Sequence, residues 1–106
     1  LKLAKLKIQD SEFSLQFERK NLENKLKSQQ QEIMSLQIQQ EYNSKLVRDF
    51  STLLSAEDRL FNMGESSLFL INSRENTLVS SQLNAIVLEN RIFQAILGLF
   101  KTRAQP

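Results

Sequence analysis

Few side chains in this sequence could do acid, base or nucleophilic chemistry, and their spacing does not suit it. The chain has no cysteine and no histidine, which excludes thiol and imidazole nucleophiles and the usual thiolate and imidazole zinc site. The adjacent carboxylates Glu57 and Asp58 lie in a helical pattern, where neighbouring side chains point in different directions and cannot act as an acid and base pair. We therefore expect a protein that is not an enzyme, with no catalytic residue, no metal site and no cofactor.

Net charge and hydropathy limit the classes of partner that this chain can bind. The 14 basic and 12 acidic residues leave a formal charge of +2, which is too balanced to attract a polyanion, so nucleic acid is not expected as a partner. No uninterrupted apolar run approaches the roughly 20 residues of a membrane-spanning helix. The chain opens inside a periodic segment and not with a secretory signal, so we interpret it as a piece of a longer protein.

Any functional residues of this chain must be held in place by long helices. Two glycines and one terminal proline in 106 residues allow few turns and argue against a sheet protein. In the first arm, apolar residues recur with alternating steps of four and three, which is the pattern of a coiled-coil seam. The seam residues are Leu22, Leu26, Ile33, Leu36, Val47, Phe50, Leu54 and Phe61, with Gln29, Gln40, Asn43 and Glu57 at the intervening positions.

The one interior turn signal surrounds Gly64. A glycine suits the left-handed residue just past a helix end, and Ser66 or Ser67 can cap the helix that follows. We predict a single domain with a helix over about residues 3–63, a tip at 64–66 and a second helix over about 67–103. The fold class is then all-α, a long antiparallel coiled-coil helical hairpin.

A turn centred on Glu65 pairs residue i with about residue 130 minus i. This register places Val47 opposite Leu83 and Ile33 opposite Leu97. The residues before about Leu26 then extend beyond the second arm, without a partner.

Each arm shows a second apolar stripe, which predicts that the hairpin associates with itself. The second arm has one seam at Leu68, Ile71, Leu78, Ala85, Ile92, Ile96 and Leu99, and another at Val79, Leu83, Ile86, Phe93, Leu97 and Phe100. The second stripe of the first arm is Tyr42, Leu46, Leu53 and Leu60. A hairpin has only one internal interface, so we expect a dimer of hairpins and not a monomer.

The run from Arg59 to Glu75 resembles the hairpin tip of the TolC family of outer-membrane efflux proteins. An aromatic residue, Phe61, stands three places before Gly64, a short polar turn follows, and the aliphatic cluster Leu68–Ile71 begins the returning helix. The later segments Gln82-Leu83, Leu88–Arg91 and Ile96-Leu97 also look like the returning helix of that family.

The resemblance implies a segment of a trimeric channel. Its protomers each give strands to a barrel in the cell outer membrane and helical hairpins to a periplasmic tunnel. Solutes are exported together with an inner-membrane transporter and a periplasmic adaptor protein. The hairpin tips form the tunnel entrance, and the first arm of the family hairpin is the longer one. This segment would then lie in the periplasm.

The residues that the resemblance implies at the adaptor-facing or pore entrance all lie around the turn. They are Phe61, Gly64, Glu65, Ser66, Ser67, Asn72, Ser73 and Arg74. Some members of the family carry acidic residues six and nine places after the glycine, where this chain has Leu70 and Ser73. An acidic gate therefore does not carry over.

Two other functional classes use a helical hairpin. One is the hairpin of a periplasmic adaptor protein, which usually sits between lipoyl-like β segments and has a differently patterned tip, and neither is seen here. The other is a coiled-coil scaffold with a binding role only. The sequence upstream of Leu1 would distinguish these classes from the channel.

Overall fold

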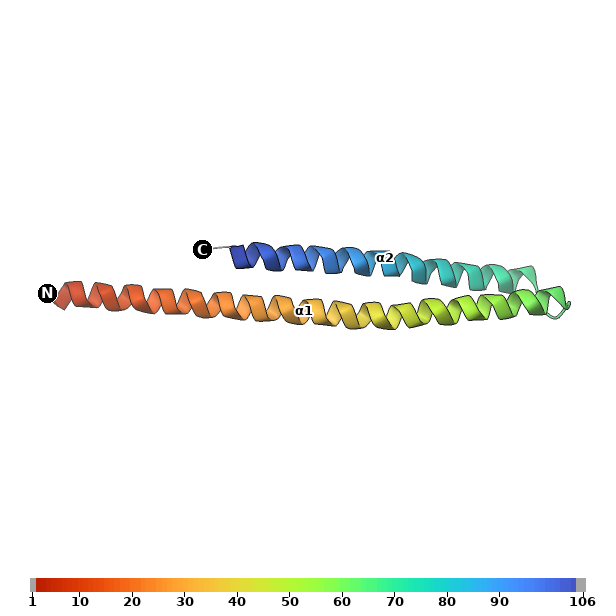
Figure 1. The fold of residues 1–106 in the computed structure, drawn as a ribbon, viewed down its shortest axis with the longest axis horizontal. Helices are drawn as coiled ribbons and strands as arrows, with labels where there is room; N and C mark the ends of the chain where they lie inside the picture. The colour runs from red at the N-terminus through yellow and green to blue at the C-terminus, as the bar shows by residue number, and fades with distance from the viewer. Residues whose placement is uncertain (1, 105–106) are drawn as a thin grey trace.

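Two antiparallel helices make up the structure. The computed structural model describes residues 2–104, in which α1 spans Lys2–Asn62, α2 spans Leu68–Ala104 and no strand occurs. The molecule measures 94 × 16 × 15 Å, because the 61 residues of α1 each rise about 1.5 Å along one axis. The predicted all-α antiparallel helical hairpin is confirmed (Figure 1).

The seam of α1 follows the predicted heptads with one exception. Its buried and half-buried positions include Leu22, Leu26, Gln29, Ile33, Leu36, Gln40, Asn43, Val47, Phe50, Leu54 and Glu57. Phe61 was expected to continue this seam but is 38% exposed. It falls in the last turn of α1, and the neighbouring Leu60 is half-buried.

The seam of α2 contains more small and polar residues than predicted. Its buried and half-buried positions include Ile71, Leu78, Ser81, Ala85, Leu88, Ile92, Ala95, Leu99 and Thr102. Leu68, predicted for this seam, is exposed at the first position of α2, directly after the turn. Small residues at three seam positions, Ser81, Ala85 and Ala95, leave space for the long side chains of α1.

The register differs from the predicted one by about three residues. Gln29 lies against Gly98 where the prediction placed residue 101, and Leu83, predicted to face Val47, is exposed. The predicted pairing of Ile33 with Leu97 is wrong for the same reason. Residues 65–67 are not helical, and extended residues rise about 3.3 Å each against 1.5 Å in a helix. The turn therefore carries α2 further back along α1, and α2 begins short of the end of α1 (Figure 1).

The first third of α1 has no helix beside it. Residues 2–21 are all exposed and Leu22 is the first half-buried position, so the overhang is about 30 Å long and shorter than predicted. The short apolar and basic opening, Lys2 to Ile8, is helical.

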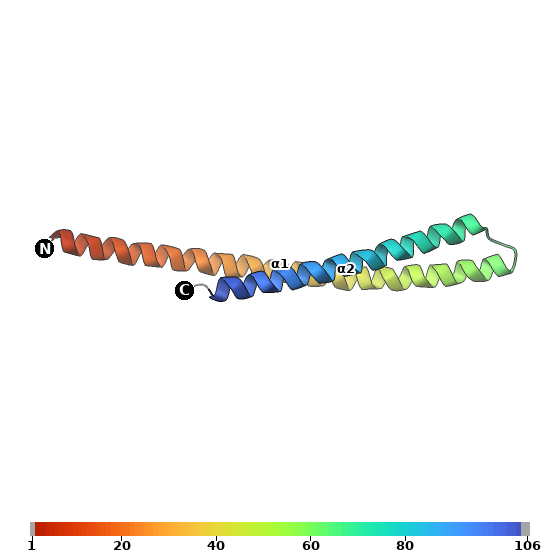
Figure 2. The ribbon, with the colours of Figure 1, turned by 90° about the horizontal axis from the view of Figure 1, so that it is seen from above.

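The hairpin is one layer thick and encloses very little. Among residues 2–104 only Leu36, Ile71 and Leu88 are buried apolar side chains, and none is completely enclosed. The accessible surface is 8869 Å², against about 6,100 Å² for a compact monomer of 12.3 kDa. Seen from above, α2 crosses over α1 near the middle of the pair (Figure 2), so the two helices share one narrow line of contact.

Candidate functional site: the tip, the polar seam and the outer face

The end of α1 is closed by backbone hydrogen bonds around Gly64. The amide of Glu65 donates to the carbonyl of Leu60 at 2.8 Å, and the amide of Gly64 donates to the carbonyl of Phe61 at 2.9 Å. These two bonds form a Schellman motif, whose left-handed residue is Gly64 with φ of 78°. The predicted role of Gly64 is confirmed, and apart from Gly64 and its two chain neighbours no atom lies within 4 Å of the place where its Cβ would stand.

Ser67, and not Ser66, caps α2. The Ser67 hydroxyl accepts a hydrogen bond from the amide of Leu70 at 3.3 Å, which satisfies one of the free amides of the first turn. The Ser66 hydroxyl is buried in the turn without a hydrogen-bond partner. The sequence allowed either serine as the cap, and the extended turn decides between them.

The remaining predicted tip residues point into solvent. Glu65, Asn72, Ser73 and Arg74 are all exposed, and the two positions where an acidic gate would stand, Leu70 and Ser73, are exposed as well. Around them the tip also exposes large apolar side chains that were not predicted as site residues, namely Met63 at 66%, Leu68 at 63% and Phe69 at 78%. The tip is therefore an apolar cap with a polar rim.

A hydrogen-bonded polar cluster crosses the middle of the seam. Asn43 is only 4% exposed; its Nδ2 donates to the carbonyl oxygen of Ser81 at 3.1 Å, and its Oδ1 accepts from Nδ2 of Asn84 at 3.0 Å. Asn43 was predicted in the seam, but its two partners were missed. Ser81 could have been found from its position three residues after Leu78 and four before Ala85.

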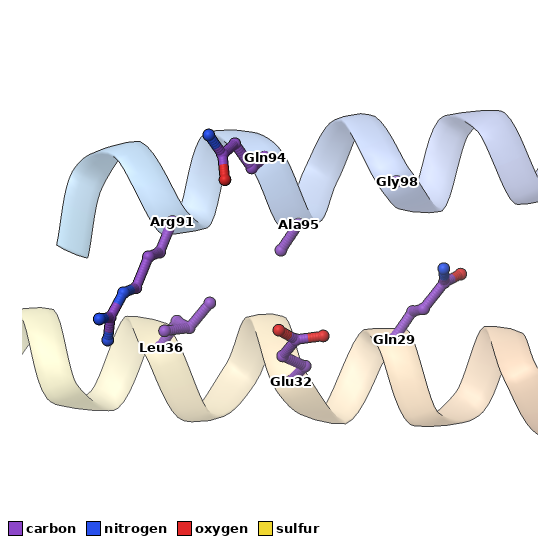
Figure 3. Close-up of a pocket in the computed structure, with 7 residues that line it drawn as sticks. All are labelled: Gln29, Glu32, Leu36, Arg91, Gln94, Ala95 and Gly98. Carbon is purple, nitrogen blue, oxygen red and sulfur yellow. The ribbon is translucent and has the colours of Figure 1, made fainter. Parts of the chain in front are cut away.

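A second polar stretch forms an open groove near the free end of α2. Gln29 and Glu32 rise from α1 while Arg91 reaches down from α2, and small residues, Ala95 and Gly98, leave space between them (Figure 3). The side-chain oxygen of Gln29 is buried here without a hydrogen-bond partner. The seam is thus polar both at its centre, around Asn43, and at this end, around Gln29.

The outer face of α2 has no partner. We use this name for Val79, Leu83, Ile86, Asn90, Phe93, Leu97 and Phe100, all of which are exposed. At 100° per residue this face lies roughly 150° around α2 from the seam. Its apolar members range in exposure from 42% at Leu97 to 62% at Phe100. The predicted second stripe of α1 is less open, because Leu46 and Leu60 are half-buried at its edge.

Judged by length and composition alone, α2 is long enough and apolar enough to cross a membrane, and only 6% of its most apolar stretch is buried. The expectation that nothing in the chain approaches a membrane span therefore holds only for uninterrupted apolar runs. Glu89, Asn90 and Arg91 follow one another directly between Ile86 and Phe93 and interrupt the apolar pattern of the helix.

Within residues 2–104 no group of three or more acidic, histidine or cysteine side chains could hold a metal ion. No protein-family model matches the chain, and no curated protein or solved structure matches it either. The described residues present three features: an apolar tip, a polar seam and an apolar face on the far side of α2.

Proposed function

We propose that this chain is a wall segment of the periplasmic tunnel of a TolC-like outer-membrane efflux channel, and that it has no enzymatic role. In this proposal the segment Phe61–Arg74 forms the tunnel entrance and faces a periplasmic adaptor protein, which links it to an inner-membrane transporter. The full-length protein would assemble as a trimer, with this hairpin in the periplasm.

The observation that carries the proposal is the position of the two apolar faces of α2. One face packs on α1, and the outer face lies on nearly the opposite side of the same helix. A helix in a compact bundle buries a single continuous stripe towards one core. A helix with apolar stripes on opposite sides suits a wall that is one helix thick, in which every helix has a neighbour on each side.

The tip supports the same proposal. The Schellman motif at Gly64 and the cap at Ser67 define one turn geometry for the run that resembles the family tip. Phe69 is the most exposed large apolar residue of the described chain, at 78%, and exposed apolar residues rimmed by polar ones are typical of protein interaction sites.

Crosslinking in cells tests the assignment of the tip. In the full-length protein, Ser67→Cys or Asn72→Cys is expected to crosslink to an adaptor or to a neighbouring tip, because both side chains lie in the exposed tip region. The matched control is Ser14→Cys, which is exposed in the overhang at the other end of α1. Crosslinks from Ser14→Cys alone would overturn the assignment, and lipoyl-like segments flanking the hairpin would support an adaptor protein in its place.

A further inference from the structure

We infer that two copies of this chain associate through the outer face of α2. The two α2 helices run parallel and in register, so that both tips lie at the same end and Asn90 meets Asn90 of the second copy. The contact is inferred for the hairpin by itself; in the full-length channel of the proposed function, a neighbouring helix of the tunnel wall would cover this face in place of the second copy.

The outer face is a complete coiled-coil seam in its own right. From Val79 to Phe100 its members follow one another with steps of four, three, four, three, four and three, which is the a and d pattern of heptads. Leu83, Asn90 and Leu97 occupy the a positions, and Val79, Ile86, Phe93 and Phe100 the d positions. No residue of α1 covers any of them, and all are exposed. The face has the pattern of a helix that is missing its partner.

Asn90 determines both the partner and the direction. In a parallel pair, a positions face a positions, so the two Asn90 amides hydrogen-bond to each other, and one such asparagine is known to favour two strands in register. In an antiparallel pair, a positions face d positions. Asn90 would then lie against Ile86 or Phe93, and its amide would be buried without a partner, which is costly.

The charges beside the seam agree with the parallel arrangement. Glu89 lies next to the seam, and in a parallel pair it faces Gln94 of the second copy, a neutral residue that can donate a hydrogen bond. In the antiparallel register that places Asn90 against Ile86, the two Glu89 carboxylates face each other and repel.

The area is of the size that a dimer requires. Six apolar side chains, each about half-exposed, would lose roughly 600 Å² per chain on complete burial, and flanking residues such as Val87 bring this close to the ~800 Å² per partner of a standard interface. Val87 is 44% exposed. The contact would cover part of the surface that the hairpin exposes in excess of a compact monomer.

A lipid bilayer is a poorer cover for the same face. A bilayer around α2 would surround the three consecutive polar residues Glu89, Asn90 and Arg91 with hydrocarbon, at a cost of about 3 kcal/mol for each charged residue near the centre. A second copy leaves Glu89 at the edge of the contact in water, leaves Arg91 in the groove beside α1 (Figure 3) and gives Asn90 a partner.

The solution mass gives the first test. Light scattering at increasing concentration is expected to show two chains, each of 12.3 kDa, in equilibrium with one chain. A mass that stays at one chain up to high micromolar concentration overturns the inference, and so does a trimer. Flotation with phosphatidylcholine vesicles, with loss of the two-chain species, would make lipid the occupant and overturn it as well.

Cysteine pairs test the direction of the two helices. Val79→Cys lies near the tip end of α2 and Phe100→Cys near its free end, and the chain has no native cysteine. In the parallel dimer, each variant alone is expected to form a disulfide-linked dimer, whereas a mixture of the two gives little mixed product. An antiparallel pair gives the opposite result, a mixed dimer with neither homodimer, and would overturn the proposed direction.

A charge substitution tests the face itself. Phe93→Asp is expected to weaken association by about 30-fold or more, as for a buried aromatic anchor, with the helical circular dichroism retained because Phe93 makes no seam contact. The matched control is Ile38→Asp, an equally exposed apolar residue on α1, at 65% against 61% for Phe93. Equal loss of association in both variants would show that the outer face is not the interface.

Discussion

Replacement of Asn43 can separate two effects of the polar seam: its contribution to the free energy of unfolding and its control of the register between α1 and α2. This side chain is 4% exposed and makes two hydrogen bonds across the hairpin, at 3.1 Å to the carbonyl of Ser81 and 3.0 Å to the amide of Asn84. Each is worth about 1 kcal/mol net. Asn43→Ala removes both and leaves space in the seam, so we expect the free energy of unfolding to fall by roughly 2 to 3 kcal/mol.

Asn43→Leu should leave the free energy of unfolding unchanged or raise it. It loses the same two hydrogen bonds, but neither partner is left buried and unpaired: Asn84 is exposed, and the carbonyl of Ser81 lies within α2, where the helix satisfies it. A buried leucine contributes about 1.5 to 3 kcal/mol. The balance is a hairpin that is as stable as the original or about 1 kcal/mol more stable.

Register is the property that Asn43→Leu should weaken. A leucine packs against several neighbours equally well, whereas an amide needs its own partners at one position. Spin labels at one exposed site in each helix, Lys45 and Asn76, should give one narrow distance distribution in the original chain and a broader one in Asn43→Leu.

Urea unfolding followed by helical circular dichroism, at one protein concentration for all variants, measures the free energies. Gln40→Leu at the neighbouring seam position is the matched control, because Gln40 makes no hydrogen bond to Ser81 or Asn84. It should be more stable without any broadening of the distance distribution. Equal destabilisation in Asn43→Ala and Asn43→Leu would refute the reasoning, since the hydrogen bonds would then outweigh apolar burial.

The turn and the overhang give three further tests, all by thermal or urea unfolding. Gly64→Val should cost about 1 to 2 kcal/mol through its left-handed φ alone, whereas Gly98→Ala, whose Cβ would lie at an ordinary contact distance of 4.0 Å from the Gln29 side chain, should stabilise by up to about 1 kcal/mol. Unchanged stability in the first variant would contradict the Schellman turn. Ser67→Ala should cost about 1 kcal/mol as a lost cap, while Ser66→Ala, which removes an unpaired hydroxyl, should be neutral or slightly stabilising; equal effects would mean that Ser67 is not the cap. Deletion up to Phe17 in the overhang should change the free energy by less than about 0.5 kcal/mol, and a larger loss would show that another element packs there.

The sequence predicts the elements well because the signals for them are local. A helix without internal glycine or proline, one glycine at the turn and a run of heptads determine two helices and most of the α1 seam. Register was missed by about one turn, because it depends on how far the three non-helical residues Glu65 to Ser67 carry the chain back. That distance is a property of the turn geometry and does not show in the periodicity of either arm.

The partners of Asn43 and Gln29 were missed for a different reason. A search for apolar periodicity passes over Ser81, Ala95 and Thr102, although each falls on a seam position of α2. These residues suit the seam because they are small or can form hydrogen bonds, and apolar periodicity shows neither property. Thr102, for example, is 3% exposed and donates to the carbonyl of Gly98 at 3.0 Å, so it satisfies its own hydroxyl within α2.

The polar residues of α1 explain which face of α2 lies inside the hairpin. The outer face is the more strongly apolar of the two, and apolar burial alone would place its aromatic residues, Phe93 and Phe100, against α1. Asn43 would then lie against aromatic rings, which cannot replace its hydrogen-bond partners, at a cost of about 1 to 3 kcal/mol for a buried unpaired amide. The observed seam gives the Asn43 amide the carbonyl of Ser81 and the side chain of Asn84 as partners. Polar groups in α1 thus direct the small and polar seam of α2 inwards, and the aromatic seam is left facing outwards, where a second chain can cover it.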